Sequence, residues 1–201
     1  LISHLNDLLT ERLVTVIAAR HGVDLSHACW LAFGSEGRCE QTIATDQDNG
    51  LVFVSADPAR DRPAWLVFAR EVNEALDACG YPLCKGNVMA CNPNCCLSQS
   101  EWLDRFAHWV DHGAPEDLLN ASIYFDLRPI AGDIALADPL RPFISQAGRN
   151  ARFMKQMADN ALANSPALNW HGGIDGRSEG GQTMVDLKLR GTAVFVDAAR
   201  L

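Results

Sequence analysis

The sequence lacks long apolar runs, basic tracts and internal repeats. No apolar stretch in its 201 residues reaches the length that crosses a membrane, and charges are spread through residues 1–20. We therefore expect no membrane association and a cytoplasmic location. The 25 acidic residues outnumber the 17 basic ones, for a net charge of −8. Because sequence-independent binding to DNA or RNA depends on lysine and arginine contacts with phosphates, this balance argues against a nucleic-acid partner.

The cysteines lack the spacing of a zinc site. Four of the seven lie close together, at positions 84, 91, 95 and 96. The usual zinc sites instead place two cysteines about two to four residues apart and repeat that pair further along the chain. An odd number of cysteines also favours reduced thiols over a disulfide framework. With 48% hydrophobic and 21% charged residues, the chain can form a core without such links. We predict buried thiols.

Helical and strand patterns are both present in the first two thirds of the chain. Apolar residues at helical spacing predict helices over residues 1–22, 64–79 and 98–113. Gly22 ends the first helix, and a capping box of Ser98 and Glu101 begins the last. Short apolar runs predict strands over residues 28–33, 50–56, 87–91 and 122–130.

The pattern changes in the last third of the chain. Residues 135–165 have a helical pattern interrupted by prolines, residues 169–181 form a glycine-rich loop, and a further helix is expected from residue 182. Strands mixed with helices and then helices alone predict two parts. The first, residues 1–135, is a mixed-sheet α/β (α+β) domain with flanking helices. The second, residues 136–201, is a helical domain that looks incomplete.

Gly34 and Ser35 follow the predicted strand 28–33 and precede a predicted short helix over residues 36–42. The first turn of a helix exposes backbone N–H groups and a partial positive charge, which suit a phosphate. Glycine allows close approach of the backbone, and the serine hydroxyl adds a hydrogen bond. Many turns of this kind bind nothing, so the pattern alone is a weak indication.

Asp46 and Asp48 precede the apolar run of the second predicted strand. Residues two apart on a strand point to one face, so their carboxylates would lie side by side. Two such charges repel each other, and a divalent cation relieves the repulsion. Magnesium prefers one or two carboxylates plus substrate phosphates, which fits a phosphate-binding turn nearby. The alternative is a plain hairpin turn at Asn49-Gly50, with both aspartates solvated at its edge.

Asp126 lies in the predicted strand 122–130. Alternation along that strand places its side chain on one face together with Tyr124 and Arg128. A carboxylate in a central strand needs a positive partner, and either Arg128 or a metal ion would serve. The metal interpretation joins Asp126 to Asp46 and Asp48 in one site.

Gly-Ser followed by Asp-x-Asp resembles the polymerase-beta-like nucleotidyltransferase superfamily. The fuller segments "GSEGRCEQTIATDQDNGLVF", "GYPLCKGNVMACNPN" and "YFDLRPIAGD" are similar to a narrower group. These are bacterial nucleotidyltransferases often fused to CBS and cyclic-nucleotide-binding modules, and related to enzymes that uridylylate or adenylylate nitrogen-regulatory proteins. The resemblance covers residues 1 to about 135, and "VDLKLRG" resembles the start of the helical substrate-binding domain that follows in this group.

The resemblance implies three nucleotide-binding residues and three residues that bind metal and catalyse. The first set is Gly34, Ser35 and Arg38; the second is Asp46, Asp48 and Asp126, with Asp126 as general base. The expected cofactor is Mg²⁺, with Mn²⁺ as a substitute. One segment departs from the group, because Cys95-Cys96 stands where a tryptophan and a basic residue are expected.

The implied reaction is attack by an acceptor hydroxyl on the α-phosphate of a nucleoside triphosphate such as ATP or UTP, with release of pyrophosphate. The acceptor would be a protein or a small molecule, the role would be in signalling, and regulatory CBS or cyclic-nucleotide-binding modules are expected in the full-length chain. A catalytically silent, nucleotide-binding regulatory module is the alternative. A purely structural interaction domain is a third interpretation, and it predicts no magnesium-dependent affinity for nucleotides.

Overall fold

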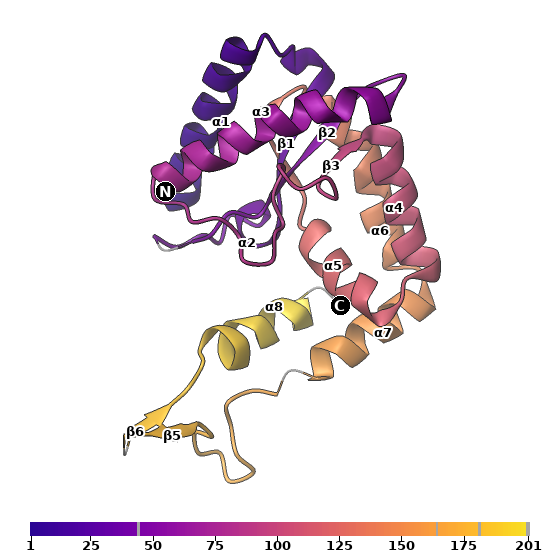
Figure 1. Cartoon of the computed structure of the whole chain (residues 1–201). Coiled ribbons are helices and arrows are strands. Elements are labelled where there is room, and N and C mark those ends of the chain that lie inside the picture. The colour runs from indigo at the N-terminus through magenta and orange to yellow at the C-terminus, as the bar shows by residue number, and fades with distance from the viewer. Residues whose placement is uncertain (44, 164, 181, 200–201) are drawn as a thin grey trace. The chain divides into compact units, whose positions relative to one another are not determined.

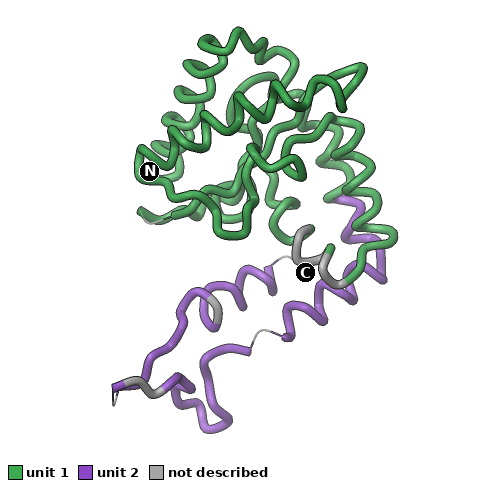
Figure 2. Tube along the Cα trace, in the orientation of Figure 1, with its two compact units in different colours: residues 1–144 green, residues 145–201 purple. Residues whose placement is uncertain are grey.

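The structure, a computed structural model, describes residues 1–43, 45–163, 165–180 and 182–199 (Figure 1). The chain divides into two compact units, residues 1–144 and residues 145–201 (Figure 2). Each unit is described separately below. Within the described residues, none of the helices has both the length and the apolar character needed to cross a membrane.

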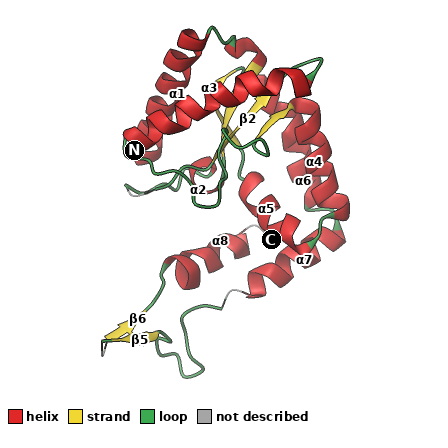
Figure 3. Cartoon of the chain, viewed as in Figure 1, coloured by secondary structure: helices red, strands yellow, loops and turns green. Residues whose placement is uncertain are grey.

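A four-stranded mixed sheet lies at the centre of the first unit. Its strands are β1 (Ala28–Ala32), β2 (Asn49–Phe53), β3 (Cys96–Ser98) and β4 (Arg128–Gly132), in the order β3-β2-β1-β4. The central strand β1 runs antiparallel to both β2 and β4, and β3 runs parallel to β2. Together with the flanking helices, this sheet confirms the predicted α+β class (Figure 3).

Helices α1 (Ile2–His21) and α3 (Pro58–Ala78) pack together against the sheet. Their buried residues form one hydrophobic cluster with Trp30 of β1 and Phe53 of β2. On α3, Phe68 lies edge-on to the Trp30 ring at a centroid distance of 6.5 Å. This cluster holds two long helices against one face of the sheet, which fixes the positions of the strand ends.

Helices α4 (Gln99–His112) and α5 (Pro115–Tyr124) contact each other through a second set of aromatic rings. Phe33, at the end of β1, lies 5.8 Å from the Trp102 ring and 4.9 Å from the Tyr124 ring. The indole N–H of Trp102 donates a 3.0 Å hydrogen bond to the carbonyl of Leu51 in β2. These contacts fix both helices to strands β1 and β2.

Local sequence signals account for most helix ends. Gly22 ends α1 in the left-handed conformation, with φ of 64°. Ser98 and Glu101 form the predicted capping box at the start of α4. Helix α3 begins at Pro58, six residues before the predicted start at residue 64, because Asp57 caps it and proline suits a first helical position.

One predicted strand is wrong, and another is correct only over its last three residues. Residues 87–91 form no strand, and β3 lies further on at Cys96–Ser98. In the predicted strand 122–130, the first residues instead complete helix α5, and β4 begins only at Arg128. Short apolar runs fit a strand or a buried helix equally well, and here packing of Tyr124 against the rings of α4 selects the helix. Pro129 is tolerated inside β4 because β4 is an edge strand.

The second unit is mainly helical, as predicted, but it also contains a small hairpin. Helix α6 (Arg141–Ala147) crosses the boundary between units, and α7 (Ala151–Ala163) follows. The short strands β5 (Arg177–Glu179) and β6 (Gln182–Met184) pair antiparallel. The helix predicted from residue 182 is therefore wrong at its start; a helical turn covers Lys188–Thr192, and α8 covers Ala193–Ala199.

Candidate active site

The predicted site residues gather at one end of the sheet because of its strand directions. Strand β1 ends at Ala32, which pairs with Asn49 at the start of β2 and with Arg128 at the start of β4. The segment after β1 and the segments before β2 and β4 therefore meet at the same edge. These segments carry Gly34-Ser35, Asp46-x-Asp48 and Asp126, respectively.

A four-residue helix, α2 (Gly34–Gly37), directly follows β1, in place of the predicted helix over residues 36–42. Gly34 has φ of 52°, a conformation that favours glycine. A Cβ atom at this position would lie 3.2 Å from Oδ2 of Asp48. The carboxylate of Asp48 therefore lies against the Gly-Ser turn, and only a residue without a side chain leaves it that space.

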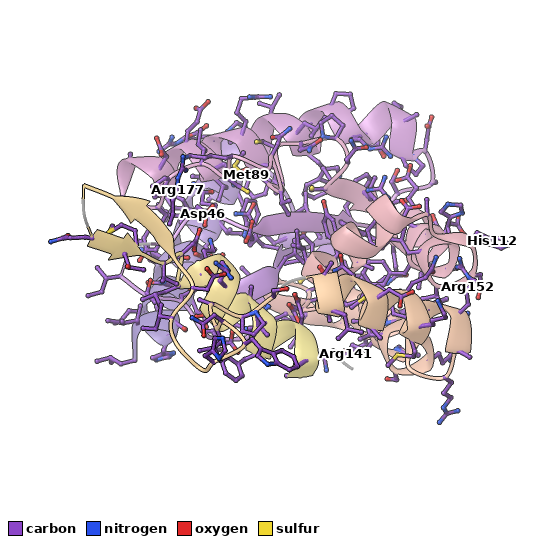
Figure 4. All side chains as sticks on the ribbon, turned by 90° about the horizontal axis from the view of Figure 1, so that it is seen from below. Asp46, Met89, His112, Arg141, Arg152 and Arg177 are labelled. Carbon is purple, nitrogen blue, oxygen red and sulfur yellow. The ribbon has the colours of Figure 1, made fainter. Side chains whose placement is uncertain are left out.

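Asp46 and Asp48 lie in the segment just before β2, which begins at Asn49. Asp46 is exposed (labelled in Figure 4). Asp48 is half-buried; its backbone carbonyl accepts a 2.9 Å hydrogen bond from the N–H of Phe33, and its Oδ1 accepts one of 3.2 Å from the thiol of Cys84. Because Asn49 and Gly50 are the first residues of β2, the alternative hairpin turn at these two residues is wrong.

Gln47, between the two aspartates, is buried and anchors the segment. Its side-chain amide donates to the carbonyls of Asn73, at 3.0 Å, and Tyr81, at 2.8 Å. Asn73 in turn donates to the side chains of Gln47, at 2.7 Å, and Asn49, at 2.9 Å. This buried amide network holds Gln47 inward, so the aspartates on either side of it are held at the surface.

Asp126 lies in the turn between α5 and β4, with its backbone against α2. A Cβ atom at Gly37 would lie 1.6 Å from the carbonyl oxygen of Asp126, so the two backbones touch. The Asp126 carboxylate forms an ion pair with Arg38, which also binds Glu40 at 2.9 Å. The positive partner of Asp126 is therefore Arg38. The sequence pattern predicted Arg128 or a metal ion as this partner and did not indicate Arg38.

The aspartates do not form a three-carboxylate cluster here. Strands β2 and β4 pair with opposite edges of β1, so their starts are about 10 Å apart. In the part of the chain that the structure describes, no group of three or more Asp, Glu, His or Cys side chains is arranged to hold a metal ion. Asp46 and Asp48 together still match the one or two carboxylates that Mg²⁺ takes alongside substrate phosphates.

Arg128 holds helix α2 in place. Its guanidinium binds both oxygens of Asp7 on α1 at 2.9 Å, and it donates to the backbone carbonyls of Glu36, at 2.8 Å, and Gly37, at 3.1 Å. A bidentate arginine pair of this kind gives a fixed geometry as well as energy. The last carbonyls of α2 thus gain donors that a four-residue helix cannot supply itself.

Glu36 is a buried carboxyl that the sequence patterns did not single out, with 6% of its surface exposed. Its pKa is raised from 4.5 to about 8, mainly by burial; the charge of Asp7 contributes to the rise, whereas Arg128 opposes it. Asp48 also raises it, so Glu36 and Asp48 are electrostatically linked. A neutral Glu36 is the form that this position favours at neutral pH.

We expect Glu36→Gln to remove a pH dependence of the free energy of unfolding. With a pKa of about 8 in the fold against 4.5 ordinarily, Glu36 contributes stability that is complete below about pH 4.5 and is lost as pH rises through about 8. Glutamine cannot ionise. The melting temperature of Glu36→Gln minus that of the wild type should therefore rise between about pH 5 and pH 9.

Thermal unfolding followed across this pH range measures that difference. The exposed Glu74 on α3 supplies a matched control, and Glu74→Gln should keep a constant offset from the wild type. A constant offset for Glu36→Gln as well would contradict the assignment of Glu36 as a buried neutral acid.

The seven cysteines are unpaired thiols in the described structure, but the prediction that they are buried holds for only three of them, and Cys39 and Cys79 are exposed. Cys95 and Cys96, the residues that depart from the resembled group, are both among the buried ones. The thiol of Cys95 lies 3.2 Å from the hydroxyl of Tyr124, and burial raises the pKa of Cys96 to about 12. Both side chains are therefore part of the core, and a bound ligand could not contact them.

Comparison with known proteins gives matches to two family models. The model described as "Putative nucleotidyltransferase DUF294" matches residues 1–116, which include α2 and both aspartates of the Asp-x-Asp pair. The model described as "Putative nucleotidyltransferase substrate binding domain" matches residues 151–201. No curated protein and no solved structure matches the chain.

Proposed function

The chain belongs to the DUF294 family of putative nucleotidyltransferases, and on this premise we propose that it transfers a nucleoside monophosphate from a nucleoside triphosphate to a hydroxyl group. The donor would be ATP, UTP or another triphosphate, and the acceptor a protein or a small molecule held by the substrate-binding domain over residues 151–201. The role would be in signalling, with regulatory CBS or cyclic-nucleotide-binding modules in the full-length protein.

One observation carries this proposal. The sheet brings the Gly34-Ser35 turn and the Asp46-x-Asp48 pair to the same end, with the Asp48 carboxylate in contact with Gly34. A turn that suits phosphate thus lies against Asp48, one of the two carboxylates that suit a divalent cation. Neither feature alone would indicate phosphoryl transfer, but their contact does.

Asp46 and Asp48 would hold Mg²⁺, or Mn²⁺ in its place, which would neutralise charge on the phosphates. Arg38 would bind the triphosphate, and doing so would release its ion pair with Asp126. Asp126 would then take the proton of the acceptor hydroxyl. The acceptor oxygen forms a bond to the α-phosphorus as the bond from that phosphorus to the bridging oxygen breaks, and pyrophosphate leaves.

A magnesium-dependent thermal shift is the expected result when the protein is screened with ATP, UTP, GTP and CTP. A ligand at about 100 times its Kd stabilises the fold by about 2.7 kcal/mol, so the preferred triphosphate should raise the melting temperature clearly. The shift should largely disappear without a divalent cation, because the carboxylate pair then repels the phosphates. An equal shift with and without the cation, or none with any triphosphate, would contradict the proposal.

The ion pair between Arg38 and Asp126 favours one second candidate, a catalytically silent nucleotide-binding module. As described, the expected base is neutralised by a neighbouring arginine. Incubation with α-³²P-labelled triphosphates separates the two candidates. Labelled product or released pyrophosphate supports the transferase, whereas magnesium-dependent binding without either, over a broad set of acceptors, supports the silent module.

A further inference from the structure

A cleft of about 640 Å³ opens in the first unit beside the carboxylate pair. Its walls are residues 86–94 on one side and helices α4 and α5 on the other. Ligand pockets in proteins commonly enclose about 300–1,000 Å³, so the cleft has the size of a small-molecule site. None of the site residues predicted from the sequence lines it.

The wall formed by residues 86–94 is joined to the candidate active site. The thiol of Cys84, two residues before this wall, donates to Asp48, and the carbonyl of Cys84 accepts a 2.9 Å hydrogen bond from the N–H of Asn87. The next residue, Val88, accepts a 3.0 Å hydrogen bond from the N–H of Asn49 at the start of β2. The cleft therefore begins within a few residues of Asp48, and its position is fixed by β2.

The groups that line the cleft suit a nucleoside. Asn87 and Asn94 are exposed there, and each amide offers donors and an acceptor, the pattern that the edge of a base requires. Asp104 on α4 is exposed at the opposite wall, and a carboxylate accepts hydrogen bonds from ribose hydroxyls. Trp109 and Tyr124, both mostly buried, close the cleft with aromatic surface.

The charged residues of the cleft do not favour the triphosphate of a nucleotide. Its lining has two carboxylates, Asp104 and Asp117, and one guanidinium, Arg105. Arg105 is already engaged, since it donates to the carbonyl of Asn94 and lies 5.7 Å from the centre of the Trp102 ring. A polyanion would gain no net attraction here. The triphosphate is better placed at α2, which leaves the uncharged part of the nucleotide for the cleft.

We infer that this cleft binds the base and ribose of the nucleoside triphosphate, and that its lining determines which base is accepted. The inference rests on the proposed function, because it places one end of the same substrate. Bound in this way, the nucleotide extends from residues 86–94 and α4 toward Asp48 and α2. Base selectivity then depends on the residues of the cleft and not on α2 or the aspartates.

The test fills the cleft from each wall with a large side chain. His108→Trp acts from the exposed face of α4. Gly86→Trp acts from the opposite wall, where a Cβ atom would have ordinary contacts of 3.6 Å and 4.0 Å. The matched control is His112→Trp, one helical turn after His108, with the two rings stacked 5.9 Å apart and His112 outside the cleft. Melting temperatures establish that each variant folds.

Isothermal titration calorimetry with Mg²⁺ then measures Kd for the four nucleoside triphosphates and for inorganic triphosphate. We expect His108→Trp and Gly86→Trp each to weaken the preferred nucleoside triphosphate at least tenfold while inorganic triphosphate binds as in the wild type. His112→Trp should match the wild type for both. If a folded variant binds the nucleoside triphosphate as the wild type does, or if inorganic triphosphate weakens equally, the inference is overturned.

If the proposed function itself is wrong, the same experiment gives a different result. In that case the wild-type protein itself binds no nucleoside triphosphate, and the inference falls with it. If instead the wild type binds a nucleoside triphosphate and the filled-cleft variants bind it with the same affinity, the transferase proposal stands and the inference about the cleft is overturned. Asn94→Ala gives a further check, because removing its amide should change the order of preference among the four bases.

Discussion

Replacing Asp48 with asparagine should lower the rate of nucleotidyl transfer by a factor on the order of 10³. Asparagine keeps the shape of the side chain but removes one of the two charges proposed to hold the divalent cation. The loss should fall mainly on the catalytic rate and on the magnesium dependence of nucleotide binding. A radiolabelled transfer assay over a range of Mg²⁺ concentrations measures both.

The folded state should not suffer from this change. Asp48 is half-buried beside Gly34, so removing its charge removes a desolvation cost, and asparagine keeps an oxygen that can accept the hydrogen bond from the Cys84 thiol. We expect Asp48→Asn to melt at or above the temperature of the wild type. Loss of activity with unchanged stability distinguishes a site residue from a residue that only supports the fold.

Asp77 offers a control carboxylate, because it is exposed on α3, far along the chain from the predicted site residues. Asp77→Asn should retain the activity of the wild type. If Asp48→Asn transferred nucleotides within threefold of the wild-type rate, the carboxylate pair would not be the metal site.

The second large effect is expected for Gly37→Ala. The new Cβ atom would lie 1.6 Å from the carbonyl oxygen of Asp126, a distance that no side-chain rotation can relieve, since both groups are fixed to backbone. Either α2 or the turn before β4 must move. Overpacking of this kind costs about 3 kcal/mol, which corresponds to a fall in melting temperature of roughly 10 °C for a chain of this size.

Activity should fall together with stability in Gly37→Ala, because the displaced elements carry Arg38 and Asp126. Gly148→Ala is the comparison, since a Cβ atom there would meet only the carbonyl of Ser145, at an ordinary 3.8 Å. That variant should melt within about 2 °C of the wild type. Equal melting temperatures for Gly37→Ala and the wild type would mean that the two backbones are further apart than described.

The sequence predicted those parts of the fold that depend on local signals. Gly22 and the Ser98–Glu101 capping box set helix ends through contacts within a few residues, and both were placed correctly. The strands β1 and β2 were found from continuous buried runs. Residues 122–124 were misassigned because their helical state depends on aromatic contacts with Trp102 and Trp109, which lie far back along the chain.

Only part of the site was predicted, because only part of it depends on local patterns. The Gly34-Ser35 turn and the Asp46-x-Asp48 pair are local patterns, and the strand directions bring them together. The partners of Asp126 and Arg128 lie 88 and 121 residues away, at Arg38 and Asp7. No pattern in one sequence identifies such pairs. Glu36 was missed because burial of a single charged residue depends on the whole packed arrangement.

The buried amide network around Gln47 has a consequence for how this protein can diverge. Gln47 is the single residue between the two aspartates, and its hydrogen bonds to Asn73 and Tyr81 hold its side chain in the interior. Descendants of this sequence can exchange the residues of the cleft and so acquire new substrates. An insertion or deletion next to Gln47 would instead move an aspartate relative to this anchor, so the spacing of the pair is constrained by the interior and not only by the site.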